Sequence, residues 1–96
     1  MLTVPAGDIQ QVPGEVRWQP AAGAVKYEVR VLEVDGTELW KVQTAESSVE
    51  LPAAIQARIV PAKTLFCQVS AFDATGHQVA ASGTVRFRVL RTVRQP

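Results

Sequence analysis

The chain has 96 residues and a net charge of +1, and 47% of its residues are hydrophobic and 20% charged. This is the length of one domain and the composition of an ordinary folded protein, which argues against a disordered chain. Because the net charge is so small, no strong electrostatic field draws the chain toward nucleic acid, and we expect no nucleic-acid partner.

The sequence also lacks the patterns of membrane insertion and export. No apolar run approaches the roughly 20 residues of a membrane helix, so we expect no direct membrane insertion by this segment. No charged segment followed by an apolar one marks a signal peptide. If the natural protein is exported, this chain is a piece of a larger protein with Met1 added at its start, and we expect this in preference to a complete gene product. Cys67 is the one cysteine, so no intramolecular disulfide forms.

Period-two alternation of apolar and polar residues is the main pattern along the chain. The first residues, up to about Val12, mix apolar residues with proline and glycine, which predicts a broken edge strand. Val16 and Trp18 then alternate with charged residues, and residues 26–31 show the same alternation. Further strands of this kind are predicted at residues 37–44, 49–51, 65–72 and 85–89.

Turn signals separate these strands. Asp35-Gly36 predicts a two-residue type I′ hairpin, and residues 73–76 predict a second turn. Residues 53–59 form the one stretch that suits a helical turn, and the flanking prolines limit it to a short connection across one end of the fold.

About seven short strands with turn signals roughly every 8–12 residues are typical of a β-sandwich. We therefore predict one all-β domain, a two-sheet antiparallel sandwich with its folded part at about residues 8–90 and a frayed polar tail at residues 91–96. The predicted core shares one register in consecutive strands and comprises Trp18, Tyr27, Val29, Val31, Leu51, Leu65, Cys67, Val69, Phe87 and Val89.

Two runs of sequence resemble a known family. Residues 18–29 (WQPAAGAVKYEV) have a tryptophan, a Pro/Gly loop and a tyrosine that opens the next strand. Residues 67–76 (CQVSAFDATG), followed by Ser82 and residues 87–89, form the second run. Both are similar to bacterial fibronectin type III-like domains. Gly-Ala before Tyr27, and Leu39-Trp40 after Asp35-Gly36, resemble more particularly the domains in extracytoplasmic parts of anti-sigma factors and FecR-like membrane proteins. One departure is Leu65, which stands where the family commonly has a tyrosine that closes a corner by a hydrogen bond.

This resemblance implies an immunoglobulin-like fold and an accessory role, and it carries over no catalytic residue. It also implies a location on the periplasmic or extracellular side, and a partner that is another protein or an adjacent domain of the same chain. From the resemblance we expect a non-catalytic protein-interaction or spacer module. Packing near residues 61–65 must then hold the corner that the missing hydroxyl would close.

Catalytic chemistry has little support in the sequence. A nucleophile needs an adjacent base, but Cys67 falls in the predicted inward register and His77 in a turn. We interpret Cys67 as an inert core thiol and His77 as a solvated turn residue. The carboxylates are scattered, and no spacing suits a metal site or a phosphate-binding loop. We expect no enzyme activity, no cofactor and no metal.

The candidate contact site is the outward face of a sheet in which the strand at residues 63–73 is predicted to lie between those at residues 26–34 and 84–90. Phenylalanines at outward positions break the polar alternation, and a rim of charges around them suits a contact with a neighbouring domain or, as weak self-association, a second copy. The simpler alternative is that arginine side chains cover the rings. Instead of contacting nucleic acid, Arg86 and Arg88 are expected to form ion pairs across strands, with Glu28 on the same face. The candidate residues are Glu28, Arg30, Phe66, Gln68, Phe72, Arg86 and Arg88.

The alternative function is a carbohydrate-binding module with Trp40 as the platform. Such a site needs a second aromatic ring in plane and polar groups around it. Within its own strand Trp40 is accompanied only by Leu39 and Val42. A packing role for Trp40 at a sheet edge or against a neighbouring domain is the competing interpretation.

Overall fold

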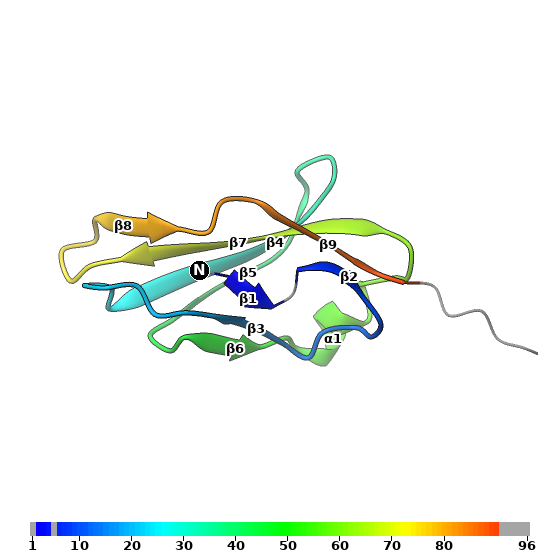
Figure 1. Cartoon of the computed structure of the whole chain (residues 1–96), viewed down its shortest axis with the longest axis horizontal. Coiled ribbons are helices and arrows are strands. Elements are labelled where there is room, and N and C mark those ends of the chain that lie inside the picture. Colours follow the sequence, from blue (N-terminus) through cyan, green and yellow to red (C-terminus); the bar gives the residue numbers. More distant parts are fainter. Residues whose placement is uncertain (1, 5, 91–96) are drawn as a thin grey trace, which may run out of the picture.

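The computed structural model describes residues 2–4 and 6–90, with side chains from residue 6 onward. The predicted tail at residues 91–96 lies outside these residues. The described chain is mostly β-structure with one short helix (Figure 1). Its elements are β1 (Leu2–Val4), β2 (Gly7–Ile9), β3 (Glu15–Trp18), β4 (Lys26–Glu33), β5 (Glu38–Thr44), β6 (Ser48–Glu50), α1 (Ala53–Gln56), β7 (Thr64–Phe72), β8 (Gln78–Ala81) and β9 (Val85–Val89).

The strands form two sheets. The smaller has the order β1-β3-β6, and the larger has the order β2-β9-β7-β4-β5, with β8 also paired to β7. The prediction of antiparallel pairing throughout was wrong in one place, because β2 runs parallel to β9. In Figure 1 the smaller sheet and α1 lie below the strands of the larger sheet.

The parallel pair follows from the broken edge strand that the sequence predicts. β1 pairs with β3 at the edge of the smaller sheet, whereas β2 pairs with β9 at the edge of the larger one. The start of the chain therefore supplies one edge strand to each sheet, on the same side of the molecule. This break, together with the separation of β8 from β9, is why the described residues contain nine strands instead of about seven.

The hairpin between β4 and β5 differs from the prediction. The Glu33 N–H donates to the Thr37 carbonyl at 2.8 Å, and the Gly36 N–H donates to the Glu33 carbonyl at 3.0 Å. Only Gly36 in this loop has a positive φ, +91°, whereas a type I′ turn needs two such residues. The loop is therefore a three-residue connection, in which the glycine takes the left-handed position that a side chain would strain.

The turn predicted at residues 73–76 is confirmed and has the same construction. The Asp73 N–H donates to the His77 carbonyl at 2.9 Å, and the Gly76 N–H donates to the Asp73 carbonyl at 3.0 Å. Gly76 has a φ of +88°.

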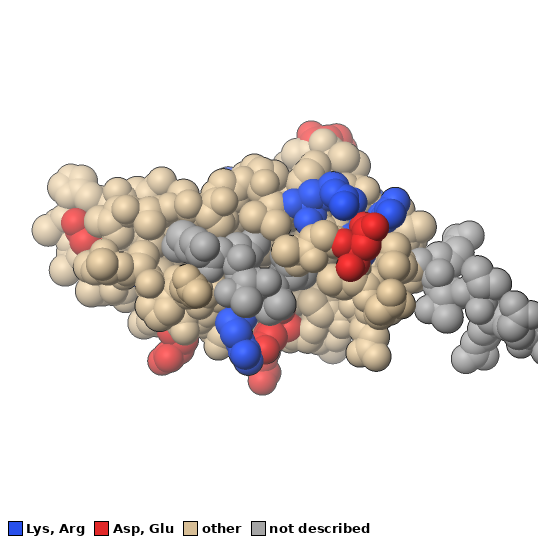
Figure 2. Space-filling model, in the orientation of Figure 1, with Lys and Arg blue, Asp and Glu red and all other residues tan. Residues whose placement is uncertain are grey.

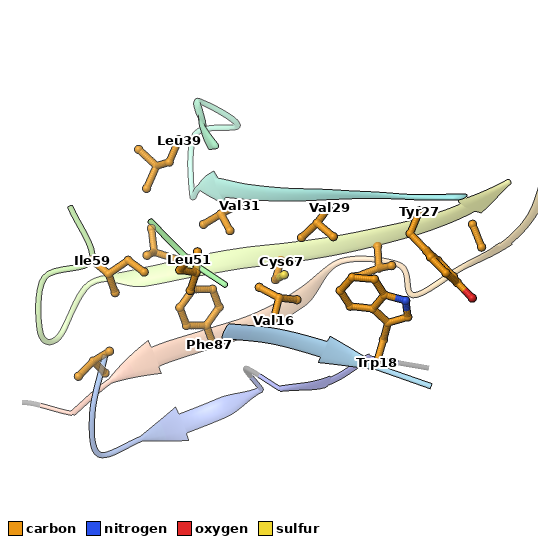
Figure 3. Packing of buried hydrophobic residues seen from close by; sticks show 14 residues of the cluster. Val16, Trp18, Tyr27, Val29, Val31, Leu39, Leu51, Ile59, Cys67 and Phe87 are labelled. Atoms are coloured by element: carbon orange, nitrogen blue, oxygen red, sulfur yellow. The ribbon is translucent and has the colours of Figure 1, made fainter. Parts of the chain in front are cut away.

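The hydrophobic core lies between the two sheets (Figure 3). The smaller sheet contributes Val16 and Trp18, and the ring of Trp18 meets that of Tyr27 edge-on with centroids 5.3 Å apart. Every predicted core residue is confirmed, because each is no more than 3% exposed. The same cluster also contains Val16, Leu39, Ile59 and Ala71.

The connection between β6 and β7 contains the predicted helical turn, α1. The side-chain amide of Gln56 donates to the Leu51 carbonyl at 2.8 Å, and the Ala62 N–H donates to the Val89 carbonyl at 2.7 Å. Ile59 and Leu65 are buried beside it. Buried apolar residues and hydrogen bonds to backbone carbonyls therefore hold this connection. Within the described residues no helix is long and apolar enough to cross a membrane.

Substitution of the central tryptophan tests this core. Trp18→Ala should lower the free energy of unfolding by about 3–5 kcal/mol, because it removes a large, almost fully buried ring and leaves a cavity. Trp40→Ala is the matched control and should cost less, since Trp40 is only half-buried. Urea titration of both variants measures the two losses. A loss below about 1 kcal/mol for Trp18→Ala would show that Trp18 is not a central core residue.

Candidate functional site

The candidate face lies on the side of the larger sheet that points away from the core. β7 lies between β4 and β9, which confirms the predicted strand order. Phe66 is paired with Leu32 on β4 and with Arg86 on β9, and Gln68 is paired with Arg30. Cross-strand partners point to the same side of a sheet, so the register brings residues of all three strands onto one face.

Leu32 is the residue of this face that the sequence did not reveal. It directly follows the inward Val31, and a register shift against β5 lies between the two. Its side chain is 8% exposed but does not belong to the core cluster. Leu32 and the half-buried Phe66 therefore form a small apolar centre on the outward face. The signal in the sequence was two consecutive apolar residues at the end of a strand that otherwise alternates.

Charged groups around this centre are paired with one another. The Asp8 carboxylate on β2 accepts hydrogen bonds from Arg86 and Arg88. Both Nη atoms of Arg86 lie 3.4 Å from Oδ1, and Nη2 of Arg88 lies 3.2 Å from Oδ2. Figure 2 shows these basic and acidic side chains gathered where β9 and β2 lie. The predicted cross-strand pairing of the arginines is thus confirmed, and Asp8 is the partner.

A second ion pair lies on the β5 side of the face. Arg30 Nε is 2.9 Å from Glu38 Oε1, and Gln43 donates to Glu28 at 3.5 Å. Between 37% and 48% of each ion-paired side chain of the face is exposed. Such pairs contribute little to folding, on the order of 0–1 kcal/mol each. Their main effect is to leave the face with few charges that lack a partner.

Phe72 shares the face but lies apart from this centre. Strand geometry places its ring about 20 Å along β7 from Phe66, and the polar Gln68 and Ser70 come between them. Gln68 donates to the Thr84 hydroxyl at 2.7 Å. Lys26 Nζ lies 5.9 Å from the centroid of the Phe72 ring, within the range of a cation–π contact. The two phenylalanines therefore mark separate points on the face.

Trp40 lies elsewhere. It is paired with Val31 on the inward side of β5, at the edge of the larger sheet, and its half-buried ring packs against the core cluster. Packing at a sheet edge therefore explains the position of the Trp40 ring. This is the interpretation that competed with a sugar-binding platform.

The titratable groups elsewhere have local roles. Cys67 is buried at 0% exposure, and burial raises the pKa of its thiol to about 12. His77 is exposed, as predicted, and its Nδ1 lies 2.8 Å from the Thr75 hydroxyl oxygen. That hydroxyl donates to Asp73 at 2.7 Å. Within residues 6–90, no three His, Cys, Asp or Glu side chains form a group suited to a metal ion.

Comparisons with protein-family models, with curated proteins and with solved structures found no match to this chain.

The Asp73 and Asp35 turns generate a prediction about pH. Hydrogen bonds from the Thr75 hydroxyl and the His77 N–H lower the pKa of Asp73, and the Thr37 N–H lowers that of Asp35. A carboxyl group whose pKa is lower in the folded state adds stability above its unfolded pKa of about 3.9, and this stability is lost as the pH falls through the folded pKa.

The double variant Asp35→Asn, Asp73→Asn should therefore lose less stability than the parent between pH 5 and acid conditions. Urea titrations at a series of pH values below 5 measure this slope. An unchanged slope would show that the two turn carboxylates do not contribute to acid sensitivity.

Proposed function

We propose that this chain is a fibronectin type III-like β-sandwich that acts as a non-catalytic interaction or spacer module of a larger bacterial extracytoplasmic protein. Two observations support the sandwich. The core lies between a smaller and a larger sheet. The two family-like residues Trp18 and Tyr27 also meet across these sheets, and the Tyr27 hydroxyl accepts the Ala21 N–H at 3.1 Å.

The observation that supports an interaction role is the apolar centre of the outward face. Leu32 and Phe66 lie in the middle of the larger sheet, where a solvated face would carry polar residues. Around them lie the ion pairs of Asp8 with Arg86 and Arg88. An apolar centre with a polar rim is the arrangement of protein contact sites.

The occupant that fits this face best is a neighbouring domain of the same protein. The apolar centre is small, and the charges beside it are already paired, so the face offers little attraction for a partner that diffuses freely. A domain joined through a short linker is held at an effective concentration in the millimolar range. Contacts between domains of one chain are accordingly smaller and more polar than permanent interfaces.

Hydrogen–deuterium exchange tests this proposal. In the complete natural protein, amides at residues 64–68 and 84–88 should exchange more slowly than in the isolated chain. Phe66→Ser should abolish the difference, because it removes the more exposed of the two apolar residues in the centre of the face. Phe72→Ser is the matched control and should leave the difference in place, since that ring lies about 20 Å away. Equal exchange in the two contexts, or protection that survives Phe66→Ser, would contradict the proposal.

A further inference from the structure

The outer edge of β5 differs from the other sheet edges of the described chain. The edge strands β1, β2 and β6 have three residues each and β8 has four, whereas β5 has seven. β5 lies last in its sheet, with β4 as its strand partner. In an antiparallel pair, alternate residues of an edge strand direct their N–H and C=O groups away from the sheet. β5 therefore carries the longest unpaired backbone ladder.

The inward side of β5 has apolar residues that a further strand would cover. Trp40 and Val42 are half-buried and pack against the core cluster, so the core ends at this edge. The register shift at Leu39 limits the regular part of the strand to residues 40–44. Apolar side chains on an added strand, opposite Trp40 and Val42, would extend the core by one strand.

The outward side of β5 carries an uncompensated charge. Lys41 is exposed and is paired across the strands with Arg30, a group of the same sign. Arg30 is neutralised by Glu38, but Lys41 belongs to none of the ion pairs of the described residues. A carboxylate on an added strand, opposite Lys41, would give this ammonium group an ion-pair partner across the strands.

Pairing of residues 40–44 with the same residues of a second copy does not supply that carboxylate. The antiparallel registers that pair residues 40–44 with themselves place Lys41 opposite either Lys41 or Gln43. A register centred on Trp40 brings the irregular Leu39 into the ladder instead. The edge is thus better suited to a different segment than to itself.

We propose that β5 is a strand-addition site for an extended segment of another protein, with a carboxylate residue between two apolar residues. The backbone ladder supplies the hydrogen bonds, Lys41 selects the acidic residue, and Trp40 and Val42 select the apolar ones. This edge is a different surface from the outward face, and the proposal does not depend on a domain docking there.

A tethered strand of defined sequence tests the site directly. The probe is the segment Thr-Thr-Val-Glu-Val, fused after Pro96 through about 25 Gly and Ser residues. Such a linker reaches up to about 80 Å when extended, and the longest dimension of the molecule is 56 Å. In antiparallel pairing with residues 40–44, the glutamate of the probe lies opposite Lys41. The matched control carries lysine in place of that glutamate.

Amide exchange of β5, resolved by NMR, is the measurement. With the glutamate strand, alternate β5 amides should become protected and should exchange about fivefold more slowly than with the lysine strand. In the Lys41→Glu variant the preference should reverse, because the charge opposite the probe has changed sign. This reversal separates a true pairing from a general effect of the tether.

Three results would overturn the proposal. One is an absence of protection of β5 amides with either strand, and another is equal protection by both strands. The third is protection of β5 in the unfused protein that rises with its concentration, which would assign the edge to a second copy. None of these results bears on exchange at residues 64–68, so the domain-docking proposal is tested separately.

Discussion

Strand β7 is hydrogen-bonded along both of its edges, to β4 on one side and to β9 and β8 on the other. Its inward residues, Leu65, Cys67, Val69 and Ala71, are all 0% exposed. Because strand side chains alternate, this buried row fixes which residues of β7 point outward. A slip of one residue would expose the whole row to water, so the register of the larger sheet depends on this one strand.

The two sheets have different edge strands on the two sides of the molecule. On one side the start of the chain supplies the edge strand of each sheet, since β1 pairs with β3 and β2 with β9. On the other side β5 and the short β6 are the last strands of their sheets, and Trp40, Val42 and Val49 pack there at the border of the core. The edge of β5 that has no neighbouring strand also carries Lys41, which forms none of the ion pairs among the described residues. The outward face and this edge are thus separate surfaces, and we propose a tethered neighbour for the first and an added strand for the second.

Alternation in the sequence was sufficient to predict the core, because each of those residues lies in a strand whose inward side meets the other sheet. It predicted Cys67 and Trp18 as buried, and both are. Alternation failed where the backbone departs from regular pairing. Leu32 follows a register shift, and the loop at Gly36 has one more residue than the Asp-Gly signal indicated. Strand propensity reveals neither departure, and only the break in alternation at Val31-Leu32 marks the first one in the sequence.

The candidate face was predicted only in part for a related reason. Sequence register placed Phe66 and Arg86 on one side of the sheet, and the structure brings them opposite each other. The partner of the arginines, Asp8, comes from the first part of the chain, more than 70 positions away in sequence. Its position depends on the crossing of the chain from one sheet to the other, which is a property of the whole fold. The spacing between Phe66 and Phe72, in contrast, already follows from the strand predicted at residues 65–72, because six residues of one strand span about 20 Å.

The central claim is that the smaller sheet seals the inward face of β7, and the reactivity of Cys67 tests it most directly. The thiolate is the reactive form, and burial raises the pKa of this thiol to about 12. Native-state labelling with a thiol reagent, measured across urea concentrations, gives the free energy of the opening that exposes Cys67. We predict that this free energy and its urea dependence equal those of global unfolding, whereas a thiol introduced on the outward side of β7 by Ser70→Cys in a Cys67→Ala background labels rapidly. Labelling of Cys67 in native buffer at the rate of the unfolded chain would contradict the account.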